Sequence, residues 1–477
     1  MNRQVDVAVI GAGLAGLSAI KEIRQSNKDF VLINGGGPGT TCARIGCVPS
    51  RVALHLAAVC QGRRAADWLG RTGGASWEVD PTAVLDQVRV LHDSYVDSAL
   101  TGSVEALGDA LIEDYARFIG PNTLRADGQT IEAGAIVIAT GARSFVPPDW
   151  QERLGDRVLT IETLFEQEHL PASVAVVGLG PIGLEISQAL HRLGVRVIGI
   201  DAGECVARLP DPVVNQAAVE MLRHEFPIWL GDPATAECRG DKVLVRAGPN
   251  QALVDRIFVA TGRHPNLDRL GLNMAGCATD GQGVPIHHPA TLRVGRLPIY
   301  VAGDAGGTPA NLQLATEQGR VAGYNATHHT PISLAAKTAM SIVFSEPSIA
   351  WVGPDWSALD HSQVLVGQMR FGPAGQAASA GPHRALLRVY ADRHDGRVIG
   401  GAMVGPGSEH LAHLLAWGAQ QRLTVHQMLE MPFYHPVVEE VLQDALKELA
   451  RRIRPIGSRA SALGRLITWR GRAACAA

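Results

Sequence analysis

The chain has 477 residues, 46% of them hydrophobic and 19% charged, which is ordinary for a globular protein of about three domains. Its formal net charge is −3 and its pI is near 6.6, which argues against the basic field of a nucleic-acid or membrane-surface binder. Seven scattered cysteines indicate a reducing compartment and not a secreted disulfide framework. Without a basic leader or a long apolar run, we expect a cytoplasmic, unanchored protein with a small partner.

The first predicted element is a strand at the start of residues 5 to 20, VDVAVIGAGLAGLSAI. Its apolar β-branched run is followed by Gly11, Gly13 and Gly16 in the spacing G-x-G-x-x-G, and then by helix-compatible residues. In such motifs the first glycine permits a tight turn and the second lets the backbone approach a pyrophosphate. The third lets the helix pack on the strand, so that the helix N-terminus faces the phosphates.

The same phrase returns at residues 173 to 187, SVAVVGLGPIGLEIS. Its glycines are Gly178, Gly180 and Gly183. Both units also close alike, with AIVIATGARSFVP at 135 to 147 and RIFVATGRHPNL at 256 to 267. Buried strands with glycine turns would explain the apolar runs but not the paired motifs. The repeat therefore predicts two nucleotide-binding units.

The remaining segments complete a three-domain arrangement. A third strand phrase, PIYVAGDAGG, ends in Gly303 and Asp304. Beyond residue 336 come the strand patterns ALLRVYAD and RVIGGAMVG and the helical pattern EEVLQDALKELARRI, without a nucleotide motif. We predict an α/β fold with two Rossmann-like dinucleotide-binding domains and a C-terminal α+β dimerisation domain. Their expected bounds are 1–150 for the first, completed by about 271–335, 151–270 for the second, and 336–477 for the third.

The chain ends in RRIRPIGSRASALGRLITWRGRAACAA, which contains several arginines and no acidic residue. We expect this basic tail to be solvated and partly disordered. Docking of the tail to an acidic partner is the alternative.

The residue at the end of the second strand of each unit is expected to contact a ribose. In the second unit it is Asp201, whose carboxylate would accept from the ribose hydroxyls and repel a 2′-phosphate, which favours NAD(H) over NADP(H). The alternative is an aspartate that caps the following turn. The equivalent residue in the first unit is Asn34, a neutral amide without charge assistance.

Two cysteines, Cys42 and Cys47, lie in one glycine-rich stretch, GGGPGTTCARIGCVPSR. In a regular helix, five steps of about 1.5 Å would separate them by about 7.5 Å, beyond the roughly 7 Å Cα limit for a disulfide. A distorted turn at Gly46 would bring the sulfurs together, and Pro49 suits the first turn of a helix that follows. The pair alone fits a disulfide, a metal half-site or two unrelated thiols. No second cysteine pair completes a zinc set, so we expect no metal.

The phrase TTCARIGCVPSR, after a G-x-G-x-x-G motif, resembles the redox-active disulfide signature of the pyridine nucleotide-disulfide oxidoreductases. The phrases GLGPIGLE, VATGRHPN, AGDA and MPFYHPVVEE follow in family order, so the resemblance covers nearly the whole chain. Within the family the chain is most similar to the dihydrolipoamide dehydrogenases. The resemblance implies FAD in the first unit, NAD(H) in the second and a homodimer formed through the C-terminal domain.

The resemblance also implies roles for individual residues. Cys47 is the thiol next to the flavin and Cys42 the one that exchanges with substrate. His435 is the acid/base, acting on the disulfide of the other subunit, and Glu440 orients it. Without the resemblance, His435 would be interpreted as a surface or capping histidine. The expected cofactor-binding residues are Gly11, Gly13, Gly16, Asn34, Thr41, Arg51, Ala116, Thr140, Gly141 and Asp304 in the first unit, and Gly178, Gly180, Gly183, Glu185, Asp201 and Gly262 in the second.

The chain departs from the family pattern in several places. Arg51 stands where a lysine is usual, and its partner by motif is Glu185, which predicts an ion pair near the flavin with altered geometry. Asn34 stands where an acid is expected to hold the FAD ribose, and residues 437 and 438 are valines where the family has a threonine-led phrase. These departures concern cofactor affinity and substrate fit more than the chemistry.

The sequence thus predicts an FAD-dependent, NAD-linked dithiol/disulfide oxidoreductase. Electrons would pass from a dihydrolipoyl group through the Cys42–Cys47 disulfide and the flavin to NAD⁺, or in reverse. The partner would be a lipoyl-bearing carrier protein or a small disulfide. One alternative is a glutathione-type or mercuric reductase, although the tail has only Cys475 where mercuric reductases have a vicinal pair. Another alternative is a non-catalytic flavoprotein sensor or scaffold. The presence of both cysteines together with His435 and Glu440 argues against it.

Overall fold

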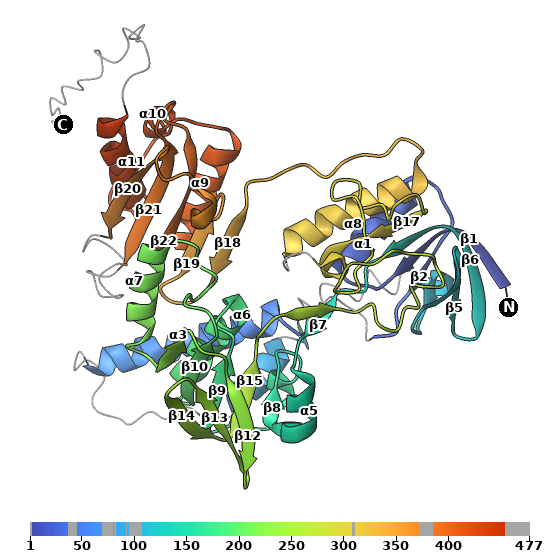
Figure 1. Cartoon of the computed structure of the whole chain (residues 1–477), viewed down its shortest axis with the longest axis horizontal. Coiled ribbons are helices and arrows are strands. Elements are labelled where there is room, and N and C mark those ends of the chain that lie inside the picture. Colours follow the sequence, from blue (N-terminus) through green and yellow to red (C-terminus); the bar gives the residue numbers. More distant parts are fainter. Residues whose placement is uncertain are drawn as a thin grey trace, which may run out of the picture. The chain divides into compact units, whose positions relative to one another are not determined.

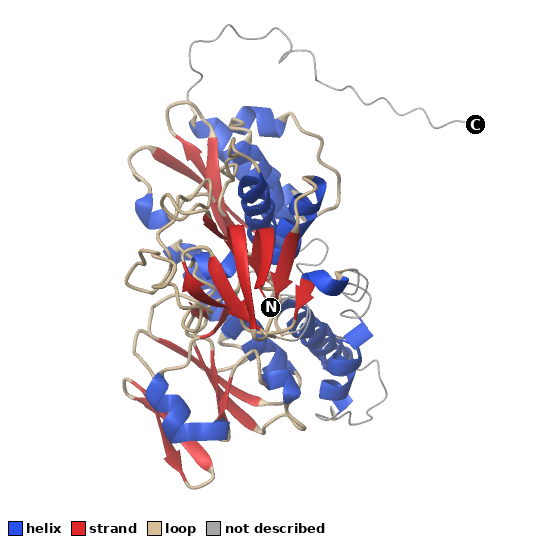
Figure 2. Cartoon of the chain, turned by 90° about the vertical axis from the view of Figure 1, so that its right-hand side faces the viewer, coloured by secondary structure: helices blue, strands red, loops and turns tan. Residues whose placement is uncertain are grey.

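The computed structural model of the chain describes residues 2–36, 45–68, 80, 83–91, 93–94, 107–307, 311–371 and 385–453. It divides into two compact units, Met1–Arg208 with Met221–Lys337, and Leu209–Glu220 with Thr338–Ala477. Both units contain helices and strands (Figures 1 and 2). Within the described ranges, no helix has both the length and the apolar character that a membrane crossing requires.

The first sheet of unit 1 has seven strands in the order β3-β2-β1-β6-β5-β4, with β17 paired to the end of β6. Strands β1, β2, β3, β6 and β17 run parallel and are mostly apolar, because helices and loops cover both faces of such a sheet. The strands are β1 (Asn2–Ile10), β2 (Phe30–Ile33), β3 (Leu111–Ile112), β4 (Arg117–Gly120), β5 (Thr123–Ala126), β6 (Gln129–Ile138) and β17 (Ile299–Val301). Helices α1 (Leu14–Gln25) and α8 (Leu312–Thr327) pack against each other.

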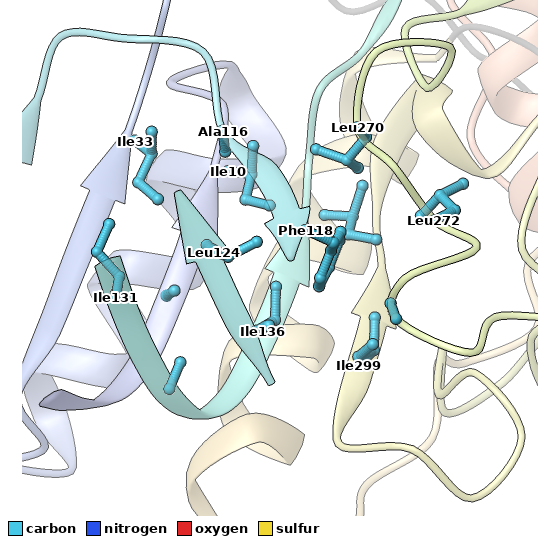
Figure 3. Close-up of a cluster of buried hydrophobic side chains, with 14 of the residues drawn as sticks. Ile10, Ile33, Ala116, Phe118, Leu124, Ile131, Ile136, Leu270, Leu272 and Ile299 are labelled. Carbon is cyan, nitrogen blue, oxygen red and sulfur yellow. The ribbon is translucent and has the colours of Figure 1, made fainter. Parts of the chain in front are cut away.

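A hydrophobic core lies against this sheet (Figure 3). Phe118 and Leu124 enter it from the antiparallel strands β4 and β5. Leu270 and Leu272 enter it from the segment that follows the second nucleotide unit, and Ile299 enters from β17. The chain therefore returns to the first domain after completing the second.

The second sheet of unit 1 has five parallel strands in the order β11-β10-β9-β15-β8. They are β8 (Val158–Leu159), β9 (Ser173–Val177), β10 (Arg196–Asp201), β11 (Ile228–Leu230) and β15 (Arg256–Val259). An antiparallel sheet of β12 (Thr235–Arg239), β13 (Lys242–Ala247) and β14 (Asn250–Val254) packs into the same core. Helix α5 (Pro148–Leu154) contributes to this core, and α6 (Pro181–Arg192) packs against α3 (Cys47–Trp68).

The two nucleotide-binding domains are joined by a two-stranded antiparallel ribbon. It consists of β7 (Ala142–Ser144), which follows the closing phrase of the first unit, and β16 (Arg263–Pro265), which follows that of the second. The two crossings of the chain between the domains therefore lie side by side.

Unit 2 is built on an antiparallel sheet in the order β18-β19-β22-β21-β20. Its strands are β18 (Met340–Val343), β19 (Ile349–Val352), β20 (Val364–Arg370), β21 (Leu386–Asp392) and β22 (Val398–Val404). Helices α9 (Ser408–Gln420) and α11 (Glu440–Arg452) pack on the sheet, and α10 (Val425–Leu429) packs on α11. The predicted two Rossmann-like domains and C-terminal α+β domain are confirmed.

One segment joins unit 2 from within the second nucleotide-binding sequence. Helix α7 (Pro212–Leu222) begins after Asp211, which is fully buried and caps the helix by accepting from the backbone N–H of Val213 at 2.9 Å. The Asp211 carboxylate also accepts from Arg388 Nη1 at 2.5 Å and from the Tyr390 hydroxyl. A buried carboxylate requires such partners, and they fix the start of α7 to β21.

Candidate active site

Cys47, one of the two cysteines that the sequence predicts to be redox-active, is the first residue of α3. This helix begins at Cys47, and the backbone N–H of Ser50 donates to Gly46 O at 3.0 Å in its first turn. The predicted helix after Gly46, with Pro49 in its first turn, is present. Cys42 and Thr41 lie outside the described residues, so the disulfide stays a prediction.

The glycine motif of the first unit forms a tight strand–turn–helix junction. Gly11 has a φ of +104°, and a Cβ there would stand 2.4 Å from Ala139 O. A Cβ on Gly16 would stand 1.9 Å from Gly11 O, so a side chain at either position would break the junction. A Cβ on Gly13 would meet nothing within 4 Å, which leaves this side of the loop open to a pyrophosphate. The loop therefore fits the FAD that the sequence predicts.

The second unit repeats this geometry. Gly178 has a φ of +94° and lies against Ala260 O, and Gly183 lies against Gly178 O. Near Gly180, the middle glycine, the contact is with the side chain of Arg208, whose Nε would lie 3.8 Å from an added Cβ. Apart from this side chain the middle position is open, and the loop fits NAD(H).

Asn34 and Asp201 hold the two glycine loops in the same way. Asn34 Oδ1 accepts from the backbone N–H of Ala12 at 3.1 Å, and its amide nitrogen donates to Gly36 O at 2.7 Å. Asp201 Oδ2 accepts from the backbone N–H of Leu179 at 2.7 Å, and its Oδ1 accepts from Gly203 at 2.8 Å. Each oxygen keeps a further lone pair, so a ribose contact remains compatible with this structural role.

Thr140, Gly141 and Gly262 lie where strands of the first two sheets end. Thr140 follows β6, and its Oγ1 is buried with no hydrogen-bond partner among the described residues. Such an orphaned hydroxyl fits a site that a polar cofactor completes. Gly141 and Gly262, in the two closing phrases, have φ values of +67° and +144°. Ala116 is different, because its side chain belongs to the hydrophobic core (Figure 3).

Asp304 follows β17 in a short turn, η4 (Gly303–Gly306). Burial raises the pKa of Asp304, and Arg263, whose Nε lies 3.7 Å from its Oδ2, opposes that rise. The backbone N–H of Gly303 donates to Gln318 Oε1 at 2.8 Å, which fixes the turn to α8. Neither Arg263 nor Gln318 was predicted as a site residue. Arg263 lies in the closing phrase VATGRHPN, which could have indicated it, whereas no sequence motif indicates Gln318.

Arg51 and Glu185 lie on α3 and α6, which pack together through an apolar core. That core contains Ala53 and Ala57 of α3 and Ala189 of α6. The helix pairing is compatible with the expected Arg51–Glu185 ion pair, which stays a prediction.

His435 and Glu440 are brought together in unit 2. His435 Nδ1 lies 2.8 Å from Glu440 Oε1, and Glu440 Oε2 accepts from the backbone N–H of Val437 at 3.3 Å. The hydrogen bond from His435 lowers the pKa of Glu440, so the carboxylate is ionised at neutral pH. Because Nδ1 is occupied and the side chain is 78% exposed, Nε2 is the ring nitrogen available for proton transfer.

We expect Glu440→Gln to lower kcat about tenfold or more, because the neutral amide can neither fix the imidazole tautomer nor stabilise the imidazolium. The hydrogen bond to the carboxylate is kept above the lowered pKa of Glu440 and lost as the pH falls through it. Steady-state kinetics between pH 5 and 9, where the wild-type carboxylate stays ionised, measure the loss of kcat. Glu439→Gln, at the neighbouring N-cap of α11, is the matched control and should match the wild type. Equal kcat for both variants and the wild type would remove Glu440 from the site.

The described part of the chain contains no candidate metal site. No group of three or more His, Cys, Asp or Glu side chains there could hold a metal ion.

Comparisons with known sequences agree with this arrangement. The pyridine nucleotide-disulphide oxidoreductase family matches residues 5–319, and the dimerisation domain of that family matches residues 339–446. Dihydrolipoyl dehydrogenase 3 of Haloarcula marismortui is 28% identical over 466 residues, covering 92% of this chain and 95% of the relative. Dihydrolipoyl dehydrogenase of Haloferax volcanii is 29% identical, with 92% and 95% covered. Mercuric reductase of Shigella flexneri is 26% identical, with 94% and 82% covered.

Solved structures share the fold. The HOCl-induced flavoprotein disulfide reductase RclA from Escherichia coli, in its Cu(II) complex, has a TM-score of 0.80 and 20% identity, covering 95% of this chain and 100% of that one. LpdA from Mycobacterium tuberculosis has a TM-score of 0.79 and 25% identity, with 93% and 100% covered. The chain thus belongs to the pyridine nucleotide-disulphide oxidoreductase family of FAD- and NAD(H)-using enzymes and carries the dimerisation domain of that family.

Proposed function

We propose that the protein oxidises the dihydrolipoyl group of a carrier protein and reduces NAD⁺, and that it does so as a homodimer. The observation that carries the proposal is the His435–Glu440 pair, at 2.8 Å, in a chain that also has a cysteine at the N-terminus of α3. The relatives named dihydrolipoyl dehydrogenase, which cover 92% of the chain at 28% and 29% identity, support the choice of substrate.

The residues of the chain carry the thiol chemistry. His435 Nε2 takes the proton from one substrate thiol, and the resulting thiolate attacks the sulfur of Cys42, which breaks the Cys42–Cys47 bond and releases the Cys47 thiolate. The second substrate thiol then attacks the substrate sulfur of the mixed disulfide. This step closes the lipoyl disulfide and releases Cys42. FAD, which the Gly11–Gly16 loop would hold, would supply the two-electron chemistry that links the two thiols to NAD⁺.

Glu440 keeps His435 in the tautomer that this chemistry needs. With Nδ1 bonded to the carboxylate, the lone pair of the neutral imidazole is on Nε2, and the imidazolium that forms gains a charge partner. Val437, whose backbone N–H binds the second carboxylate oxygen, limits rotation of Glu440. The pair is therefore preorganised before substrate arrives.

For the nucleotide, we expect NAD(H) to be preferred to NADP(H) by at least about tenfold in kcat/KM, because Asp201 places a negative charge beside the 2′ position. Asp201→Asn should reduce this preference, because the amide has no charge but keeps an oxygen that can accept from the Leu179 N–H, as Asn34 accepts from the Ala12 N–H. Kinetics with both nucleotides measure it. Equal or better use of NADP(H) by the wild type would contradict the assignment and point to Arg208, next to Gly180, as the ribose-side residue.

The substrate is tested by a side-by-side assay of the purified protein with dihydrolipoamide, oxidised glutathione and Hg²⁺. The proposal requires dihydrolipoamide with NAD⁺ to give the highest kcat/KM. Faster reduction of Hg²⁺ would favour the second candidate, a mercuric reductase, which the 26% identical relative of that name supports.

A further inference from the structure

Arg263 joins carboxylates from the two nucleotide-binding domains of unit 1. It stands on the ribbon strand β16, opposite Ser144 of β7. Its Nη1 lies 3.6 Å from Oε1 of Glu162, which follows β8 of the second sheet. Its Nε lies 3.7 Å from Oδ2 of Asp304, at the end of β17 of the first sheet. One guanidinium thus lies between an acid of each domain.

The Arg263 guanidinium is largely shielded from solvent. The side chains of Arg263, Glu162 and Asp304 are only 18%, 25% and 26% exposed. Nη2 donates to Ala142 O, whereas Nε is buried and has no hydrogen-bond partner among the described residues. A charge in this position acts on its neighbours with less screening than one in water.

Glu162 is held in place independently of Arg263. Its Oε1 accepts from the backbone N–H of Ser144 at 3.0 Å, and its Oε2 accepts from the Ser144 hydroxyl at 2.5 Å. Glu162 is therefore fixed to β7, and its Oε1 lies 3.6 Å from Nη1 of Arg263.

Arg263 is the cation that faces the Asp304 carboxylate, from strand β16. From helix α8, the neutral side chain of Gln318 binds the turn that contains Asp304. His287 lies beside the same turn, 3.5 Å from the position of a Cβ on Gly306, and its Nδ1 is within 2.8 Å of Pro285 O. Burial raises the pKa of Asp304, and Arg263 is the cation that opposes this rise.

We propose that Arg263 is a positioning residue of the flavin site, which keeps Asp304 ionised and oriented as an acceptor for a hydroxyl group of FAD and links it to Glu162. This inference rests on the proposed role of Asp304 in binding FAD. A hydroxyl donates a stronger hydrogen bond to a carboxylate than to a neutral acid, so retention of FAD should weaken as the pH falls through the pKa of Asp304. Without Arg263 that pKa is higher, and the weakening begins at a higher pH.

The test measures FAD release from the holoenzyme by flavin fluorescence between pH 5 and 9. In Arg263→Met, the pH midpoint of FAD retention should rise by about one unit or more, since an opposite charge at this distance shifts a carboxyl pKa by about 1 to 3 units. Arg263→Lys should restore part of the difference. The matched control is Arg143→Met on the partner strand β7, because Arg143 pairs with the half-exposed Asp268 and should leave the midpoint unchanged.

The Asp304→Asn variant tests the proposed contact between Asp304 and FAD separately from the positioning role of Arg263. The amide of Asp304→Asn carries no charge, so this variant should release FAD faster than the wild type at pH 8. Because the amide cannot titrate, adding Arg263→Met to Asp304→Asn should not change the pH midpoint of FAD retention. If Asp304→Asn retains FAD as the wild type does, the proposed flavin contact is wrong. If Asp304→Asn weakens retention but Arg263→Met and Arg143→Met show the same pH midpoint, the positioning role of Arg263 alone is overturned.

Discussion

Replacing His435 with alanine is expected to lower kcat for dihydrolipoamide oxidation by about 10²- to 10⁴-fold, the usual contribution of a positioned acid/base. Binding of FAD should not change, because His435 lies on unit 2 and the FAD glycine loop on unit 1. His426→Ala is the matched control, since His426 is an exposed histidine of the same unit, on α10. Comparable kcat values for the two variants would exclude His435 from catalysis.

The same variant tests whether each site uses residues of both subunits. Mixing an inactive His435→Ala chain with an inactive Cys47→Ser chain should restore activity, because a heterodimer contains one site with intact cysteines and an intact histidine. Subunit exchange is followed in parallel with a tagged chain. If exchange occurs and no activity returns, His435 acts within its own chain or not at all.

Replacing either cysteine of the pair with serine is expected to reduce dithiol oxidation to background, because no disulfide can then form. The two variants should still differ in colour. With Cys47 as the proposed flavin-side thiol, we expect Cys42→Ser to leave a Cys47 thiolate beside the flavin and to show long-wavelength absorbance without added reductant, whereas Cys47→Ser should not. Cys238→Ser, an exposed cysteine of unit 1, is the control and should match the wild type in both assays. Identical spectra for the Cys42 and Cys47 variants would contradict the assignment of roles.

The sequence was most informative where local chain geometry allows few residue types. A Cβ on Gly11, Gly16, Gly178 or Gly183 would clash with backbone at 1.8 to 2.4 Å, so the strand–turn–helix junctions could be predicted from the glycines alone. The predicted family and fold are confirmed for the same reason, since the motifs recur in order along the chain.

Contacts between distant segments could not be predicted from the sequence. Arg263, Glu162 and Asp304 come from three separate strand ends, and their proximity follows from the pairing of β7 with β16. Likewise, Asp211 joins unit 2 because it is buried against Arg388, which no pattern in the sequence indicates. Asn34 differs, since its place after β2 was predicted but its bond to the Ala12 N–H was not.

Anaerobic titration of the purified holoenzyme with dihydrolipoamide, in the absence of NAD⁺, tests most directly whether a redox-active disulfide lies between substrate and flavin. We predict that the first equivalent per subunit produces long-wavelength absorbance with little bleaching of the flavin band, because the electron pair resides on Cys42 and Cys47. Bleaching of the flavin by the first equivalent, with no long-wavelength absorbance at any stage, would contradict the account.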